Sequence, residues 1–137
     1  MASNPVSAAP KLRWLRALVA AFVAELALMC IAIPVYSMAA DPTAVLNLVV
    51  PPVSGLLFLV AGYWAALPIP QRGIWQGVLT GVWAVALYLA LGIGATMAGK
   101  GHVTDGFTTA YLTAHGLKIV GAAIGGWLVS RKAAPAA

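Results

Sequence analysis

Three side chains that can carry charge lie inside apolar stretches of this sequence: Glu25, His115 and Lys118. Glu25 stands in the run "AAFVAELALMC", and the other two stand in "TAHGLKIVGAAIGG". A charged side chain at the centre of a bilayer costs about 2.5–3.5 kcal/mol on insertion scales. An acid and a base in one short chain therefore predict mutual compensation, most simply as a Glu25–Lys118 ion pair. His115 lies one turn from Lys118 on the same helix face and extends the pair into a polar column.

The depths of Glu25 and Lys118 leave the form of this pairing open. At ~1.5 Å per residue, Glu25 lies ~12 Å and Lys118 ~18 Å from the inner membrane boundary. Their side chains also lean in opposite directions, because the two helices are antiparallel. Direct contact therefore needs helix tilt, and a bridging water is the alternative. The column is either a structural pair that fixes helix register or a pathway for protons or a solute.

A second unusual feature is the proline pair in "VVPPVSG". Pro51 and Pro52 remove two amide donors from the second apolar stretch, so carbonyl groups near Asn47 need other partners. Asn47 and Ser54 add polar groups on either side of this helix break. Broken helices in transporters expose backbone oxygens to substrates or ions. The alternative is a kinked helix whose carbonyls are satisfied by neighbouring helices.

The residues for other chemistries are sparse. A membrane histidine such as His115 can ligate a haem or chlorophyll-type macrocycle, but the only other histidine, His102, falls in a predicted loop. We therefore predict no cofactor. No His, Cys, Asp and Glu cluster has metal-site spacing, and the glycines of "GIGATMAGKG" match no nucleotide-binding motif. The sequence favours a protein that is not an enzyme.

The elements that carry these residues are predicted to be membrane helices. Of the 137 residues, 62% are hydrophobic and 8% charged, whereas soluble domains have about 25% charged residues. Each of four apolar stretches meets the requirement of roughly 20 residues for crossing a bilayer. We expect an all-α integral membrane four-helix bundle over residues 14–130, between a basic arm (1–13) and a short tail (131–137). Its spans are predicted at about 14–36, 44–66, 74–97 and 107–130.

The basic residues predict the orientation of this bundle. If both termini share one side, six basic residues fall on that side, and Lys100 alone falls on the other. The positive-inside rule then assigns both termini to the cytoplasm of a bacterial-type inner membrane. A basic charge near anionic headgroups contributes about 1 kcal/mol, and nucleic acid is not an expected partner because no binding fold accompanies the charges. Headgroup contact is predicted for Lys11, Arg13, Arg16, Arg131 and Lys132.

Small residues predict close helix packing. Gly77 and Gly81 form one GxxxG spacing in the third stretch, and Gly121 and Gly125 form another in the fourth. This spacing lets two helix backbones approach each other. It serves either packing within the bundle or oligomerisation.

The segment "VAEL" around Glu25 is similar to the first helix of the small multidrug-resistance transporters, which also have four helices and a functional glutamate there. The similarity covers about ten residues. It implies that a chain of this size can transport a solute when it dimerises. The proline pair and Lys118 depart from the pattern of that family, and a fixed lysine would oppose the binding of cationic drugs.

The sequence predicts two alternative functions. The first is a non-catalytic accessory or scaffolding subunit that packs against a larger membrane complex or against itself. The alternative is a small oligomeric transporter or proton-coupled channel that uses Glu25, His115 and Lys118. Expected partners are the lipid bilayer and other membrane subunits or further copies of the chain.

Overall fold

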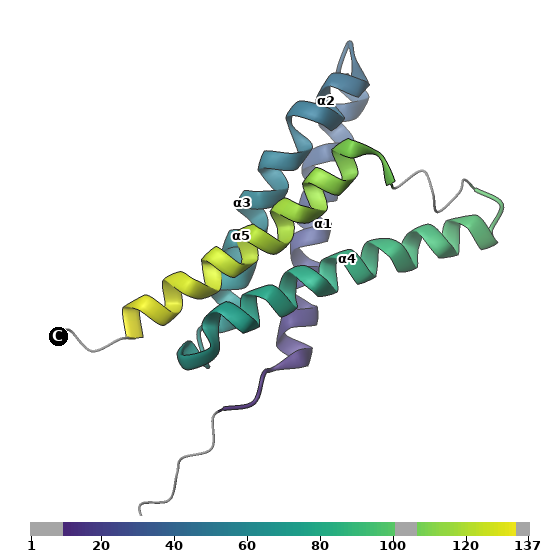
Figure 1. Ribbon diagram of the computed structural model, residues 1–137. Helices are drawn as coiled ribbons and strands as arrows, with labels where there is room; N and C mark the ends of the chain where they lie inside the picture. Colours follow the sequence, from purple (N-terminus) through teal and green to yellow (C-terminus); the bar gives the residue numbers. More distant parts are fainter. Residues whose placement is uncertain (1–9, 101–106, 134–137) are drawn as a thin grey trace, which may run out of the picture.

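The computed structural model describes residues 10–100 and 107–133, and this part of the chain is helical without strands (Figure 1). Parts of the predicted arm and tail (1–9 and 134–137) and the segment 101–106, which holds His102, lie outside the described residues. The helices are α1 (Trp14–Met38), α2 (Pro42–Leu48), α3 (Val50–Ala66), the 3-10 helix η1 (Pro70–Arg72), α4 (Gly73–Met97) and α5 (Thr109–Ala133).

Within the described ranges, four helical segments have the length and hydropathy of membrane spans, with α2 and α3 forming one of them. Their mean hydropathies lie between 1.3 and 2.5. This confirms the prediction of an all-helical chain with four membrane-length helices and indicates a multi-pass membrane protein.

Local signals explain where the helices begin and end. Asp41 caps α2, because its carboxylate accepts hydrogen bonds from the amides of Thr43 (2.9 Å) and Ala44 (3.2 Å). Pro42 occupies the first helical position, where a missing N–H is tolerated. After α4, Gly99 adopts a φ of 68°, a left-handed conformation that glycine allows without strain.

The centre of the bundle is the α3–α5 pair, the most extensive helix contact in the molecule. The two helices run side by side in the same direction (Figure 1). A Cβ added at Gly125 would overlap the backbone of Leu59, and one added at Gly121 would overlap that of Gly55. Glycines at these positions therefore let the two backbones touch.

Helix α4 also packs closely against α5 through glycines. Gly77 lies against Ala122, and Gly81 lies against Ile119. The two GxxxG pairs thus both serve contacts inside the chain. Segment 121–126 of α5 is therefore approached closely by two neighbouring helices.

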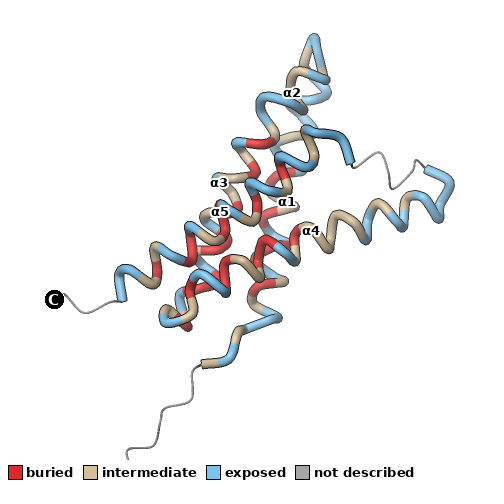
Figure 2. The backbone as a smooth tube through the Cα atoms, in the orientation of Figure 1, coloured by how far each residue is buried: buried red, intermediate tan, exposed pale blue. Residues whose placement is uncertain are grey.

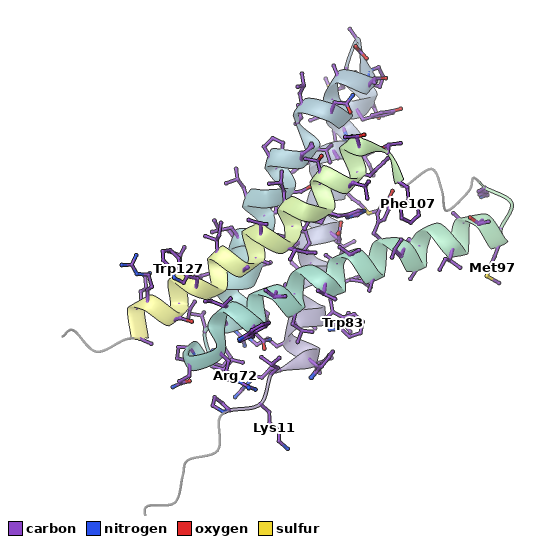
Figure 3. All side chains as sticks on the ribbon, viewed as in Figure 1. Lys11, Arg72, Trp83, Met97, Phe107 and Trp127 are labelled. Atoms are coloured by element: carbon purple, nitrogen blue, oxygen red, sulfur yellow. The ribbon has the colours of Figure 1, made fainter. Side chains whose placement is uncertain are left out.

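Burial is uneven along the helices (Figure 2). The last buried residue of α1 is Leu28 and the last of α4 is Ala84, so the last ten residues of α1 and the second half of α4 contain no buried residue. Toward its end, α4 runs away from α5 (Figure 1). We call the end where α1 begins and α5 ends the basic end, and the opposite end the far end. Figure 3 shows Lys11 and Arg72 at the basic end and Met97 and Phe107 at the far end.

Candidate functional site: a buried ion pair and its surroundings

The ammonium group of Lys118 lies at the point where all four spans meet. Its Nζ donates to the Oε1 of Glu25 at 2.5 Å, which links α5 to α1. The rings of Phe58 from α3 and Tyr88 from α4 lie 5.6 and 5.7 Å from Nζ. A cation within ~6 Å of a ring centroid is attracted by the ring's quadrupole. The charge is thus held by one carboxylate and two aromatic rings.

Because this pair is largely shielded from solvent, separating its two charges is costly. The Lys118 side chain is 3% exposed, and that of Glu25 is 16% exposed. A buried cation without a counter-charge is strongly destabilising, whereas a well-paired one is tolerated. The structure brings the two groups into direct contact, without a water between them. Helix α1 is inclined to α5 (Figure 1), so the depths predicted for Glu25 and Lys118 in upright helices do not apply.

His115 lies beside the pair without joining it by a hydrogen bond. Its ring packs edge-on against Tyr88, with centroids 4.5 Å apart and an interplanar angle of 61°. Tyr88 also contacts the ring of Tyr111, with centroids 5.6 Å apart. Both nitrogens of His115 are buried and have no hydrogen-bond partner within the described part of the chain. The polar column thus continues from Lys118 toward the far end through aromatic contacts.

The helix break is confined to one residue, Val49, between α2 and α3. Its amide donates to the carbonyl of Val45 (3.0 Å), and its own carbonyl accepts from Val53 (3.2 Å), so the path stays nearly helical. Because Pro51 and Pro52 carry no N–H, they cannot donate to the carbonyls four residues earlier.

The two polar residues beside the break have different surroundings. The Ser54 hydroxyl is buried and donates to the carbonyl of Val50 in its own helix at 2.8 Å. Asn47 lines a pocket of about 380 Å³ between the beginnings of α2 and α5, together with Thr43, Tyr111 and Ala114. Asn47 therefore faces a cavity at the far end, and Ser54 does not line it.

Basic side chains gather at the basic end, where aromatic rings hold several of them. The guanidinium of Arg16 lies 3.8 Å from the centre of the Trp64 ring, and that of Arg131 lies 4.8 Å from the centre of the Trp127 ring. Lys132 donates to the hydroxyl of Tyr63 at 3.1 Å. Lys11 and Arg13 are exposed. This arrangement of cations and amphipathic rings is typical of a headgroup region.

Sequence reasoning missed three residues that shape these sites. Phe58 and Tyr88 enclose the ammonium of Lys118, but aromatic residues in an apolar helix give no signal of that role. Gln76 is fully buried, and its amide binds both main-chain groups of Arg13, at 3.0 and 2.9 Å. A glutamine inside a predicted span was the available signal for this contact.

No metal site is apparent in the residues that the structure describes, because no three His, Cys, Asp or Glu side chains come together there. Cys30 is exposed. Comparisons of the chain with protein-family models, with curated proteins and with solved structures find no match.

Proposed function

We propose that the protein is a non-catalytic accessory or scaffolding subunit of a bacterial-type inner membrane, with both termini in the cytoplasm. Its bundle packs against other membrane subunits or against further copies of the chain. The observation that carries this proposal is the Glu25–Lys118 pair, which ties the spans together at their common meeting point. A charge pair closed by two aromatic rings suits a fixed scaffold better than a site that exchanges ligands.

The second half of α4 supports partner binding. Leu91 is 61% exposed and Met97 is 84% exposed. In the first half of the same helix, Gly77 and Gly81 touch the backbone of α5, but no described residue lies within 4 Å of a Cβ added at Gly94. Small residues in membrane helices commonly mark close helix contacts. We infer that a helix of a partner subunit packs against α4 near Gly94.

The test is the mass of the full-length protein purified in a mild detergent from its native membrane. We expect it to co-purify with another subunit or as an oligomer. Gly94→Leu should abolish this association, because the larger side chain blocks close helix approach. Gly116→Leu is the matched control, since no described residue lies within 4 Å of a Cβ added at Gly116 in α5. A monomeric wild-type protein, or equal loss in both variants, would contradict the proposal.

A second candidate function, a small transporter or proton-coupled channel, is favoured by His115 and the far-end pocket. The ring nitrogens of His115, which have no hydrogen-bond partner among the described residues, provide sites for water or a proton carrier beside Lys118. The pocket lined by Asn47 and Ala114 lies one helical turn from Lys118 along α5. Proton flux in liposomes that is lost in Glu25→Gln and His115→Phe, while both variants remain folded, would favour this function over the scaffold.

A further inference from the structure

A long apolar groove runs along the surface between α1 and α3. Its volume is about 510 Å³, with Ala20, Ala24 and Ala61 among its lining residues and Val19 and Trp64 beside them. The alanines are buried and small, so their positions leave room between the larger side chains. The groove is thus a recess in a surface that faces hydrocarbon, if the four helices span a bilayer.

The groove continues into a second hollow at the basic end. This hollow, of about 490 Å³, shares Val19 and Trp64 with the groove and is lined further by Arg13, Trp14 and Arg16. From Arg16 to Ala27, the last α1 residue of the groove, is eleven residues, or ~16 Å of helix. That length is about half of a ~30 Å hydrocarbon core, which is the depth of one leaflet.

The two arginines at the mouth have no counter-charge among the described residues. Within the described ranges, neither guanidinium forms an ion pair, because Glu25 is bound to Lys118 and Asp41 caps α2 at the far end. Arg16 uses its Nε and Nη2 to donate to the carbonyl of Trp64, at 3.2 and 2.8 Å. A guanidinium has five N–H donors, so the others are available to an anion.

The arginines are also held in place. The ring of Trp64 lies under the guanidinium of Arg16 at 3.8 Å. The main chain of Arg13 is fixed by Gln76, which leaves the Arg13 side chain exposed at the entrance. A held guanidinium at Arg16 and an exposed one at Arg13, on the wall of the same hollow, suit a phosphate, which they can bind by charge-assisted hydrogen bonds.

We propose that the α1–α3 groove and its arginine mouth form a binding site for one anionic phospholipid. The phosphate lies between Arg13 and Arg16, and one acyl chain lies in the groove past Ala24. A partner helix would fill the apolar part, but it would need an acidic group at the level of the arginines. A phospholipid has both parts at the required separation. The inference holds for either proposed function, since neither the Glu25–Lys118 pair nor the second half of α4 lines the groove or its mouth.

The test uses the full chain reconstituted in bilayers of dioleoyl phosphatidylcholine with a small fraction of dioleoyl phosphatidylglycerol. The protein is then released in mild detergent, and its bound lipids are counted by native mass spectrometry. We expect about one phosphatidylglycerol per chain, enriched over its fraction in the bilayer. Arg13→Gln should weaken retention about fivefold, the effect of one basic charge near a headgroup. Its main-chain bonds to Gln76 do not depend on the side chain, so the variant keeps its fold.

Two further variants separate a site from general attraction. Arg131→Gln is the matched control: it removes the same charge at the basic end from an arginine that lines neither the groove nor its mouth, and retention should not change. Ala27→Leu fills the groove without altering charge and should also lower retention severalfold. Equal losses in Arg13→Gln and Arg131→Gln, or no effect of Ala27→Leu, would overturn the proposal.

The source of the phosphate and the nature of the occupant are tested in the same preparation. Millimolar glycerol phosphate should not displace the lipid, because it lacks the acyl chain that the groove holds. Full displacement would mark a phosphate site instead and overturn the lipid proposal. The lipid proposal would also be overturned if phosphatidylcholine were retained at its bulk ratio. It would fail equally if a protein chain protected the cysteine of Ala27→Cys from thiol reagents in the absence of lipid.

Discussion

Breaking the Glu25–Lys118 pair from either side is expected to cost more stability than removing both charges. Two unit charges 2.5 Å apart attract each other by about 6–7 kcal/mol at an effective dielectric constant of about 20. Desolvation of the two ions offsets several kcal/mol of this. We therefore expect the pair to add little net stability, whereas the coupling energy between the two side chains should be about 4–7 kcal/mol, because the desolvation costs cancel in a double-variant cycle.

The single variants should differ because the two partners are buried to different extents. Glu25→Gln leaves an ammonium that is 3% exposed without its counter-charge, so it should lower the free energy of unfolding by about 3–5 kcal/mol. Lys118→Met should lower it less, because the Glu25 side chain is more exposed. In the double variant, the methionine packs between the rings of Phe58 and Tyr88, and we expect stability within about 1 kcal/mol of wild type.

The assay is reversible unfolding in mixed micelles with increasing dodecyl sulfate, followed by circular dichroism and tryptophan fluorescence. A double-variant cycle of Glu25→Gln with Lys132→Met serves as the control, because Lys132 is exposed at the basic end. That cycle should be additive. A Glu25–Lys118 coupling below about 0.5 kcal/mol, or equal coupling to Lys132, would refute the view that this pair ties the bundle together.

Three further predictions use the same unfolding assay. Gly125→Ala should lower the unfolding free energy by about 1–3 kcal/mol, because its methyl group overlaps the backbone of α3. The control Gly116→Ala, at a position where the added methyl group meets no described residue, should raise the unfolding free energy by up to about 1 kcal/mol. Similar effects at both sites would contradict the close α3–α5 contact. His115→Phe should raise it by about 1–2 kcal/mol by removing two unpartnered ring nitrogens, and a lower stability would instead reveal a ligand or water on that ring. Gln76→Leu should lower it by about 1–2 kcal/mol, because the main chain of Arg13 loses both hydrogen bonds; an unchanged value would mean that solvent replaces them at no cost.

The helices of this protein could be predicted because hydropathy and length are local properties of the sequence. The first span was expected at 14–36 and is helical over Trp14–Met38; the third was expected at 74–97 and is helical over Gly73–Met97. The proline pair indicated a break in the second span. The break is limited to one residue, Val49, because main-chain hydrogen bonds from Val49 to Val45 and from Val53 to Val49 keep the path nearly helical. The prolines alone do not determine that extent.

The surroundings of Lys118 could not be predicted to the same degree. The depths predicted for Glu25 and Lys118 hold for helices that stand upright in the membrane. The glycine contacts of α5 with α3 and α4 instead set the angles at which the helices cross. These angles decide which side chains meet. Phe58 and Tyr88 look like any other apolar or interfacial residue until the crossing is known.

The splay of α4 has a mechanical consequence. Because the helices touch closely at one end and separate at the other, the molecule occupies a larger cross-section in one leaflet than in the other. Lateral pressure in the leaflet around the far end therefore acts on the angle of α4 and hardly on the glycine contacts. Changing acyl-chain length or headgroup size in that leaflet should thus alter the separation of α4 from α5, which a pair of spin labels at positions 93 and 112 would measure directly.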